Sequence, residues 1–547
     1  MLDRTLVDSL FPTDLPDPAF WEERYPPRQQ PAEAKVTRLG PSPTGSLHLG
    51  GLYVATLNAD IARRSGGAYL VRVEDTDQAR EVEGAVEQFD RAFAYFGLQP
   101  DEHGETGSYG PYTQSQRAMI YQSYVRELLR RDQAYLCFAT KDELAAITAQ
   151  QQAQKVPTGY YGTWALWRNA SAEEVRAKLD AGVPYVVRFR TPAEAANQRV
   201  HFVDAIRGRL EHEASRNDAV LLKSSDQDPR LPTYHLAHVV DDHLMRVNLV
   251  IRGEEWISSV PLHLQLFAAL GFEPIEYAHV APLMKQDGGS KRKLSKRKDP
   301  EASVDYYIET GFPAEAVLHY IRGLLNGRLA DTPFTEALDA PLRLSECGVA
   351  GPLVDMVKLM DISADYVATL SGAEVFDAVR TWAGEYDAEL ATVLAKERDL
   401  ALRAISVERD GVDNPRKDLR VWSDFRTAYG FFFDDLFQPV TDPSDERFGG
   451  LDPAVVRALA ADFVAGYQLV DDPQEWFGQI RELAAKHGFA KNPKEYKKNP
   501  DAYPGSIREA AQVFRVAITG STRSPDLHAV ASALGTPEVL RRVGSLR

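Results

Sequence analysis

The first hundred residues alternate between short apolar runs and stretches with helical spacing. An apolar run at 35–39 is followed by a Gly/Pro turn cluster at 40–45, after which apolar residues recur at helical spacing up to Gly66. A second apolar run, at 69–73, precedes a polar stretch and another helical pattern that reaches Phe96. This strand, helix, strand order predicts a doubly wound α/β domain with parallel strands.

The pattern becomes less regular after about residue 116. We expect a helix near 114–131 and a strand at 185–189, separated by mixed segments that interrupt the sheet as an insertion. Apolar runs at 239–240 and 249–252, followed by a helical stretch at 260–270, indicate that the sheet then resumes.

Beyond about residue 300 the spacing is helical almost throughout, and there is no internal repeat. Polar and Pro/Gly-rich stretches predict loops at 409–418, 437–452 and 489–505. The whole pattern divides the chain into an extension rich in Pro and charge (1–34), two halves of the α/β domain (35–115 and 233–288), the insertion (116–232), a basic loop with a connecting region (289–350) and a helical region (351–547).

Composition and charge narrow the class of protein. A chain of 547 residues exceeds what one hydrophobic core usually supports, so two to four domains are expected. The formal net charge of -16 argues against polyanion binding over the whole surface, but it does not exclude a local basic face. The N-terminal stretch has acids and prolines where a signal peptide needs a basic start and an apolar run. No apolar stretch approaches the ~20 residues of a membrane span.

The two cysteines, Cys137 and Cys347, lie far apart in the sequence. They can form neither a disulfide framework nor a four-thiolate zinc site. We therefore expect a reducing, cytoplasmic setting.

The segment from Pro41 to Gly51 stands where the first strand is expected to turn into a helix. Such a turn presents backbone N–H groups and the positive end of a helix to an anion, and its glycines let a nucleotide approach the backbone. His48 stands at the helix start, where its ring can donate to charge that builds on a phosphoryl group. A Pro/Gly turn with a capping histidine is the alternative interpretation, and no Walker sequence is present.

A second candidate is the basic run from Lys291 to Lys298, which follows the Gly-rich stretch 287–290. Alone, such a run is usually a solvated basic loop. Together with the first segment it predicts a different arrangement, because two cationic ends on the first strand and just past the last one can close on a triphosphate from two sides.

These segments carry a resemblance to a known family. Pro41–Gly51 resembles the "HIGH" element of class I aminoacyl-tRNA synthetases, and Lys293–Arg297 resembles their "KMSKS" loop. Further segments are similar to the glutamyl-tRNA synthetases of bacteria, namely RLGPSPTG at 38–45, EDTD at 74–77, PTYHL at 232–236 and VIRGEEW at 250–256. The match is strong over about 35–325 and weaker beyond 350, where FFFD at 431–434 and RVAITG at 515–520 fit the family's helical end.

The resemblance implies roles for individual residues. Glutamate would be bound by Arg38, Gly40, Ser42, Glu74, Tyr234, His238 and Arg252, and ATP by Thr44, Gly45, His48, Gly50, Gly51, Leu294, Ser295 and Lys296. His48, Lys293 and Lys296 would be catalytic, and Asp77 would meet the acceptor end of tRNA. The chemistry agrees, because arginine forks suit carboxylates and a carboxylate can hold an ammonium group. A structural ion pair between Arg252 and Glu74 is the alternative.

The chain departs from the family pattern at several positions. Gly40 stands where the family has Ala, which should leave room beside the amino acid. His238 stands where some members carry Asn, and the glutaminyl relatives also place His there. Some members bind zinc through cysteines in the insertion, but with Cys137 alone we predict no protein metal site, and the spacing of His235 and His238 lacks a third ligand. Anticodon-reading residues cannot be carried over.

The resemblance implies a class I synthetase with a Rossmann-type catalytic domain, an acceptor-binding insertion at 116–232, a stem-contact region within 289–350 and an anticodon-binding helical region at 351–547. Such an enzyme uses ATP with Mg²⁺ to activate L-glutamate and transfers it to tRNA(Glu), with tRNA(Gln) left open. We expect a monomer that has no membrane contact. The alternatives are a glutaminyl-tRNA synthetase, an enzyme that glutamylates a modified base, and a tRNA-binding paralogue without catalysis. The length of the region after 350 opposes an enzyme that glutamylates a modified base. Intact His48, Lys293 and Lys296 oppose a tRNA-binding paralogue without catalysis.

Overall fold

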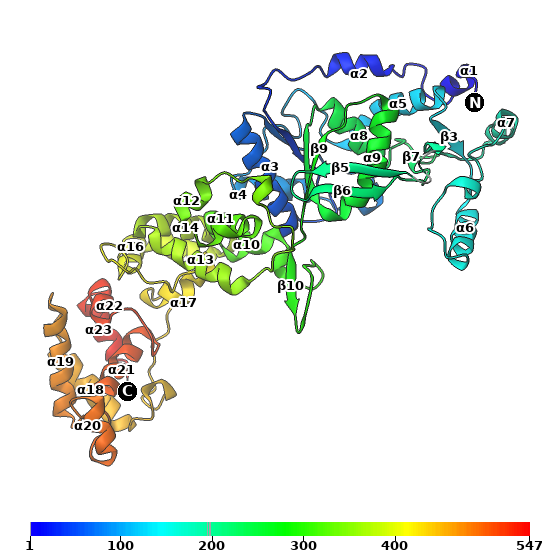
Figure 1. Cartoon of the computed structure of the whole chain (residues 1–547). Coiled ribbons are helices and arrows are strands. Elements are labelled where there is room, and N and C mark those ends of the chain that lie inside the picture. The colour runs from blue at the N-terminus through cyan, green and yellow to red at the C-terminus, as the bar shows by residue number, and fades with distance from the viewer. Residues whose placement is uncertain (1, 194, 196–197, 547) are drawn as a thin grey trace. The chain divides into compact units, whose positions relative to one another are not determined.

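The computed structural model describes residues 2–193, 195 and 198–546 (Figure 1). The chain forms two compact units, which are described separately. Unit 1 contains residues 1–306 and 318–355, and unit 2 contains residues 307–317 and 356–547. The helices α10 (Val304–Thr310) and α11 (Ala314–Leu325) are therefore each divided between the units.

The centre of unit 1 is a set of parallel strands. Strand β1 (Val36–Leu39) pairs in parallel with β2 (Ala68–Val71), and β8 (Leu249–Gly253) pairs in parallel with β9 (Glu276–Val280). Asn248 joins the two pairs, because it receives the N–H of Val36 on its side chain and donates its own N–H to the Val36 carbonyl. The carboxyl ends of these strands therefore meet at one edge, where doubly wound sheets bind ligands.

Helix α3 (Leu49–Ser65) crosses between β1 and β2 and ends where Gly66 takes a left-handed conformation with φ 71°. This confirms the predicted strand, helix, strand order. Helix α4 (Ala85–Tyr95) confirms the helical pattern that reaches Phe96. Helices α8 (Tyr234–Leu244) and α9 (Val260–Leu270) and the short α12 (Phe334–Asp339) are the further helices of this domain.

Residues 239–240 are helical and not a strand, so this expectation was wrong. They lie in α8, in which Leu236 to Asp242 are all buried. A helix that is buried on every side has no polar face, so its sequence shows no helical period, and two adjacent valines then look like a strand. The other two elements expected there, β8 and α9, are confirmed.

The insertion contains α5 (Ala118–Arg130), α6 (Lys141–Ala153) and α7 (Ala172–Asp180) and a three-stranded sheet of β3 (Ala134–Cys137), β4 (Val186–Phe189) and β7 (Val220–Leu222). The predicted strand at 185–189 and helix near 114–131 are thus confirmed. The pattern did not predict β5 (Arg199–Asp204) and β6 (Gly208–Glu213), whose alternation of exposed and half-buried positions carries mostly polar residues. These strands join the central sheet in the order β6-β5-β9-β8.

The N-terminal extension packs on the insertion's first helix. It contains α1 (Arg4–Ser9) and α2 (Pro18–Arg24), and Val7, Phe11, Leu15 and Tyr25 are buried in one cluster with residues of α5. Arg28 fixes its end by a bidentate pair with Glu102, at 2.7 and 2.9 Å, and by bonds to the Met245 carbonyl. The basic run begins on a hairpin of β10 (Met284–Asp287) and β11 (Ser290–Lys293), which projects from the unit in Figure 1.

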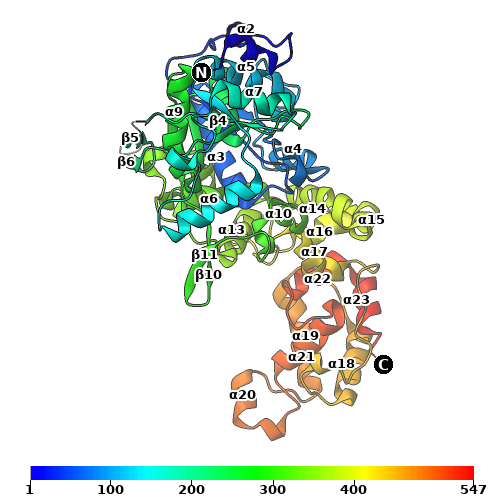
Figure 2. The same ribbon diagram turned by 90° about the vertical axis from the view of Figure 1, so that its right-hand side faces the viewer.

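Unit 2 is helical and has its own apolar core. Its helices are α13 (Met356–Thr369), α14 (Gly372–Tyr386), α15 (Ala388–Lys396), α16 (Arg398–Ser406), α17 (Phe425–Tyr429), α18 (Pro453–Gly466), α19 (Pro473–Lys486), α20 (Pro493–Lys498), α21 (Ile507–Thr519), α22 (Leu527–Leu534) and α23 (Thr536–Val543). The loop expected at 489–505 contains α20, which Asn492 caps and which projects from the unit in Figure 2. Proline at the first helical position hid this helix, since Pro usually indicates a loop.

Candidate active site

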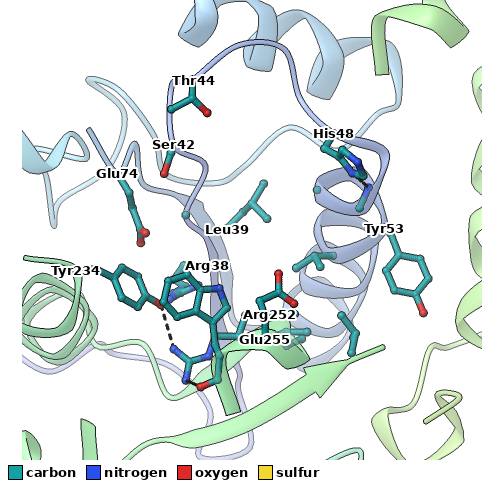
Figure 3. Close-up of a pocket in the computed structure, with 18 of the residues that line it drawn as sticks. Arg38, Leu39, Ser42, Thr44, His48, Tyr53, Glu74, Tyr234, Arg252 and Glu255 are labelled. Carbon is teal, nitrogen blue, oxygen red and sulfur yellow. Dashed lines mark hydrogen bonds between the residues drawn. The ribbon is translucent and has the colours of Figure 1, made fainter. Parts of the chain in front are cut away.

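A cavity of about 590 Å³ lies in unit 1 at the carboxyl ends of the parallel strands (Figure 3). Residues at the ends of β1, β8 and β9 line it, together with the start of α3. Twelve predicted site residues line this cavity: Arg38, Gly40, Ser42, Thr44, His48, Gly50, Gly51, Glu74, Asp77, Tyr234, Arg252 and Lys293. Five others do not: Gly45, His238, Leu294, Ser295 and Lys296.

His48 is the N-terminal cap of α3. Its ring Nδ1 accepts the N–H of Gly50 at 2.9 Å, so in the neutral ring the proton is on Nε2. Burial lowers the pKa of His48 to about 4, and the charges of Lys296 and Lys293 lower it further in the same direction. His48 is therefore neutral at pH 7, and its ring also has a hydrogen bond with the backbone of Leu294 on the basic loop.

The basic loop lies against the first motif, although the two are about 250 residues apart. Lys296 donates to the carbonyl of Ser46, and the Ser46 and Ser303 hydroxyls are 2.9 Å apart. Asp299 holds the loop, because it accepts both Nη groups of Arg292, at 2.6 and 2.7 Å, and the N–H of Ser295. Arg292 thus has a structural role, whereas Lys293 lines the cavity.

Arg252 lies buried behind Tyr234 in the cavity wall, and every group that it contacts is neutral. Its Nη1 donates to the Tyr234 hydroxyl at 3.0 Å, and its Nε donates to His279 Nε2 at 3.0 Å. Its Nη2 is 3.4 Å from the Trp256 carbonyl. Among the residues that the structure describes, no carboxylate pairs directly with this guanidinium.

Glu74 pairs with Arg72 at 3.0 Å and does not pair with Arg252. The alternative of a structural Arg252–Glu74 ion pair is therefore wrong. Burial raises the pKa of Glu74, whereas Arg72 and Arg38 oppose that rise. Gly40 makes this position of Glu74 possible, because a Cβ built on residue 40 would lie 2.3 Å from the Glu74 Oε1. The space that Gly40 leaves is filled by Glu74.

The sequence interpretation missed a buried ionic network behind the pocket. Its centre is the pair of carboxylates on α8, Asp241 and Asp242, and Arg72 donates to Asp242 at 2.5 Å. The other members are Arg38, which reaches Asp242 at 3.3 Å, and Arg117, which reaches Asp241 at 2.7 Å. Three arginines thus face Glu74 and two aspartates. The only sequence signal was a pair of acids inside an apolar helix, which is unusual because buried acids need partners.

His238 belongs to this network and has no place in the cavity wall. It is fully buried, with Nδ1 2.6 Å from Asp242 and Nε2 2.9 Å from the Tyr277 hydroxyl. Burial lowers its pKa to about 3, so the ring is neutral. A direct contact between His238 and a ligand in the cavity is not supported by this geometry.

Asp77 is exposed at the cavity rim, where it pairs with Arg80 at 2.7 Å.

No group of three or more His, Cys, Asp or Glu side chains in the described part of the chain is arranged to hold a metal ion. Cys137 and Cys347 are free and buried. Within the described residues, none of the helices combines the length and the apolar character needed to cross a membrane.

Known proteins are similar to this chain over most of its length. The family model of class I tRNA synthetases (E and Q), catalytic domain, matches residues 35–331. The glutamate–tRNA ligase of Acetivibrio thermocellus is 40% identical over 552 residues, which cover 99% of each chain. That of Clostridium perfringens is 38% identical, covering 98% of this chain and 99% of its own. A crystal structure of the glutamate tRNA ligase from Elizabethkingia meningosepticum in complex with its amino acid has a TM-score of 0.74 and 26% identity, covering 94% of this chain and 99% of that one.

The chain belongs to the class I tRNA synthetases for glutamate and glutamine. The expected fold class, a mixed α/β catalytic domain followed by a helical region, is confirmed. Within that class, its relatives over nearly the full length place it among the glutamate–tRNA ligases.

Proposed function

We propose that the chain activates L-glutamate with ATP and transfers it to tRNA(Glu). The observation that carries the choice of amino acid is Arg252, a buried guanidinium on the cavity wall whose contacts are all neutral. Leaving a buried cation without an anionic partner is costly, on the order of 2 to 5 kcal/mol, whereas a ligand carboxylate offers the bidentate partner that arginine suits. A pocket for glutamine has no use for this charge.

The same geometry supports the rest of the amino-acid site. We assign the side-chain carboxylate of glutamate to Arg252 and Tyr234, and its ammonium group to Glu74, which lies above Tyr234 in Figure 3. Arg38, Gly40 and Ser42 also line the cavity. His238 then acts through Asp242 and Tyr277, which it contacts.

ATP, bound as its magnesium complex, belongs at the start of α3. Gly50 and Gly51 line the cavity there, and the positive helix end favours phosphate, with Thr44 and Gly45 in the preceding turn. The Nε2–H of His48 and the ammonium groups of Lys293 and Lys296 approach from two sides, and Leu294 and Ser295 connect those lysines.

The reaction then needs positioning and charge stabilisation and no covalent enzyme intermediate. An oxygen of the glutamate α-carboxylate attacks the α-phosphorus of ATP, and the bond to pyrophosphate breaks. A ribose hydroxyl at the 3′ end of tRNA, which we place near Asp77, next attacks the acyl carbon and AMP leaves. His48, Lys293 and Lys296 stabilise the negative charge that builds on the phosphates during the first step.

The insertion (116–232) and the helical region (351–547) are proposed to bind the acceptor end and the anticodon arm of the tRNA. We propose that the enzyme works as a monomer in the cytoplasm, where its two buried thiols stay reduced. Sedimentation of the purified protein tests the oligomeric state.

Charging assays with purified tRNA(Glu) and tRNA(Gln), each with glutamate and with glutamine, test the function. We expect glutamate to be attached to tRNA(Glu) and glutamine to be used poorly. Attachment of glutamate to tRNA(Gln) as well would define an enzyme that serves both tRNAs. Efficient use of glutamine, or no ATP–pyrophosphate exchange with glutamate and tRNA, would contradict the proposal.

A further inference from the structure

A chain of three buried side chains reaches Arg252 from behind the cavity, and no site role has been given to two of them. Arg252 Nε donates to His279 Nε2 at 3.0 Å, and His279 Nδ1 is 2.6 Å from Asp204 Oδ2. Both His279 and Asp204 are almost completely buried. His279 lies on β9, and Asp204 ends β5 within the insertion.

The hydrogen bonds define which ring nitrogen of His279 carries the proton. The Nε of an arginine always carries a hydrogen, so His279 Nε2 must accept and the ring proton must be on Nδ1. That proton is donated to Asp204, whose carboxylate accepts it. Asp204 therefore selects the tautomer of His279 whose Nε2 can accept the Nε–H of Arg252.

Asp204 is itself fixed by the backbone. Its Oδ1 accepts the N–H groups of Ile206 at 3.0 Å and Arg207 at 2.9 Å, which close the turn between β5 and β6. In the parallel pairing of β5 with β9, Asp204 is the partner of Tyr277, two residues before His279. Oδ1 thus accepts two N–H groups of the turn, and Oδ2 faces the imidazole and also accepts the backbone N–H of His279 at 3.1 Å.

We propose that Asp204 and His279 are positioning residues that prepare Arg252 for the side-chain carboxylate of glutamate. This inference rests on the proposed function of Arg252. The imidazole takes the Nε–H of the guanidinium, which leaves for a ligand carboxylate the Nη hydrogens that do not meet Tyr234 and Trp256. Asp204 supplies a negative charge one ring away, which supports the buried cation without occupying the groups that bind the ligand.

The variant Asp204→Asn tests this relay with almost no change in shape. Because two N–H groups of the turn face Oδ1 and only the His279 N–H faces Oδ2, we expect the amide of Asn to direct its NH₂ group at His279 Nδ1. The ring proton then moves to Nε2, where it opposes the Nε–H of Arg252. We expect the KM for glutamate to rise at least tenfold, with the KM for ATP unchanged and kcat changed less than threefold.

His279→Gln is the matching variant that keeps the relay. Its amide can donate to Asp204 and accept from Arg252, so the KM for glutamate should stay within about threefold of wild type. His279→Leu has the bulk without the hydrogen bonds and should behave like Asp204→Asn. The exposed substitution Asp226→Asn serves as a control for the loss of an acid from the insertion.

The proposal and the proposed function fail in different ways. Loss of glutamate activation in the wild-type protein would contradict the proposed function, whatever the variants do. An unchanged KM for glutamate in Asp204→Asn, or equal losses in His279→Gln and His279→Leu, would overturn the relay alone. Nitrogen-15 spectra of labelled histidine give a readout without catalysis: Nδ1 should carry the proton of His279 in the wild type, and Nε2 should carry it in Asp204→Asn.

Discussion

Lys296 provides the sharpest test of the basic loop at the scale of a single residue. In the structure its ammonium group bonds the Ser46 carbonyl, so it reaches the first motif but does not line the empty cavity. Lys296→Ala should lower the rate of activation by about 10² to 10³, or roughly 3 to 4 kcal/mol, because the charge acts on the leaving pyrophosphate. ATP–pyrophosphate exchange measures the rate, and the exposed Lys298→Ala is the control. A near-normal rate would remove the loop from the mechanism.

We propose that Arg252 decides the choice of amino acid. Arg252→Ala should raise the KM for glutamate at least tenfold and barely change the weak use of glutamine, because discrimination depends on the charge pair. Arg209→Ala, an exposed position on β6, is the matched control. If glutamate use survives the loss of Arg252, the guanidinium has another purpose.

His238 predicts a dependence of stability on pH. Its pKa is about 3 in the folded chain, below the ordinary value of about 6.5, so the unfolded state binds the extra proton when the pH falls below 6.5. The stability is complete above pH 6.5 and decreases toward pH 3, by up to ~1.4 kcal/mol per pH unit. Urea unfolding of wild type and His238→Asn at pH 7 and pH 5 measures this, and the wild type should lose more. Equal losses would show that another group titrates.

The sequence could predict the residues that line the cavity better than the residues behind them. Thr44, His48 and Lys293 stand in continuous segments with turns, glycines and concentrated charge, which indicate a phosphate site directly. Asp204 and His279 are 75 positions apart and meet only because β5 pairs with β9. No local pattern contains that pairing, so the second layer of the site required the structure.

At the scale of elements, α20 carries a specific expectation about RNA. Three lysines of this helix, Lys494, Lys497 and Lys498, and Lys491 just before it are exposed, and none is paired with a carboxylate within the described residues. Replacing all four with Gln should weaken tRNA binding and flatten its salt dependence by about 0.7 to 0.9 in slope per lost phosphate contact.

The control for α20 uses lysines of the same unit that do have acidic partners. Lys396, Lys417 and Lys486 pair with Asp435, Asp365 and Asp462, at 2.9, 2.6 and 2.7 Å. Their replacement with Gln should leave the salt slope of tRNA binding nearly unchanged. Equal slopes for both variants and wild type would remove α20 from the RNA surface.

Element prediction was accurate where one face of an element is buried, and it failed at the two extremes. Helix α3 has caps at both ends and an apolar stripe, and its bounds could be expected within a residue or two. Helix α8 is buried all round, and strands β5 and β6 are largely exposed. None of these three elements therefore has the contrast between faces on which pattern analysis depends. Helix α20 was hidden by its own N-terminal proline.

At the scale of the whole molecule, the net charge of -16 contained little information about the partner. The positive groups proposed to meet phosphate are concentrated in two short segments, at 293–296 and at 491–498. A global sum cannot show such segregation. The two units also do not correspond to two continuous parts of the sequence, because residues 307–317 group with unit 2.

The grouping of residues 307–317 with unit 2 has a consequence for the order in which the chain folds during its synthesis. In unit 2, the carbonyl of Gly311 accepts the N–H of Trp422, and a Cβ on Gly311 would lie 2.8 Å from the Trp422 side chain. The carbonyl of Glu309 accepts the indole N–H of Trp382. On the ribosome, residues 307–317 emerge long before both tryptophans and must wait as an uncovered apolar segment. Arrested nascent chains should be cleaved there by protease until residues past 422 have emerged, and protection at shorter lengths would contradict this order of assembly.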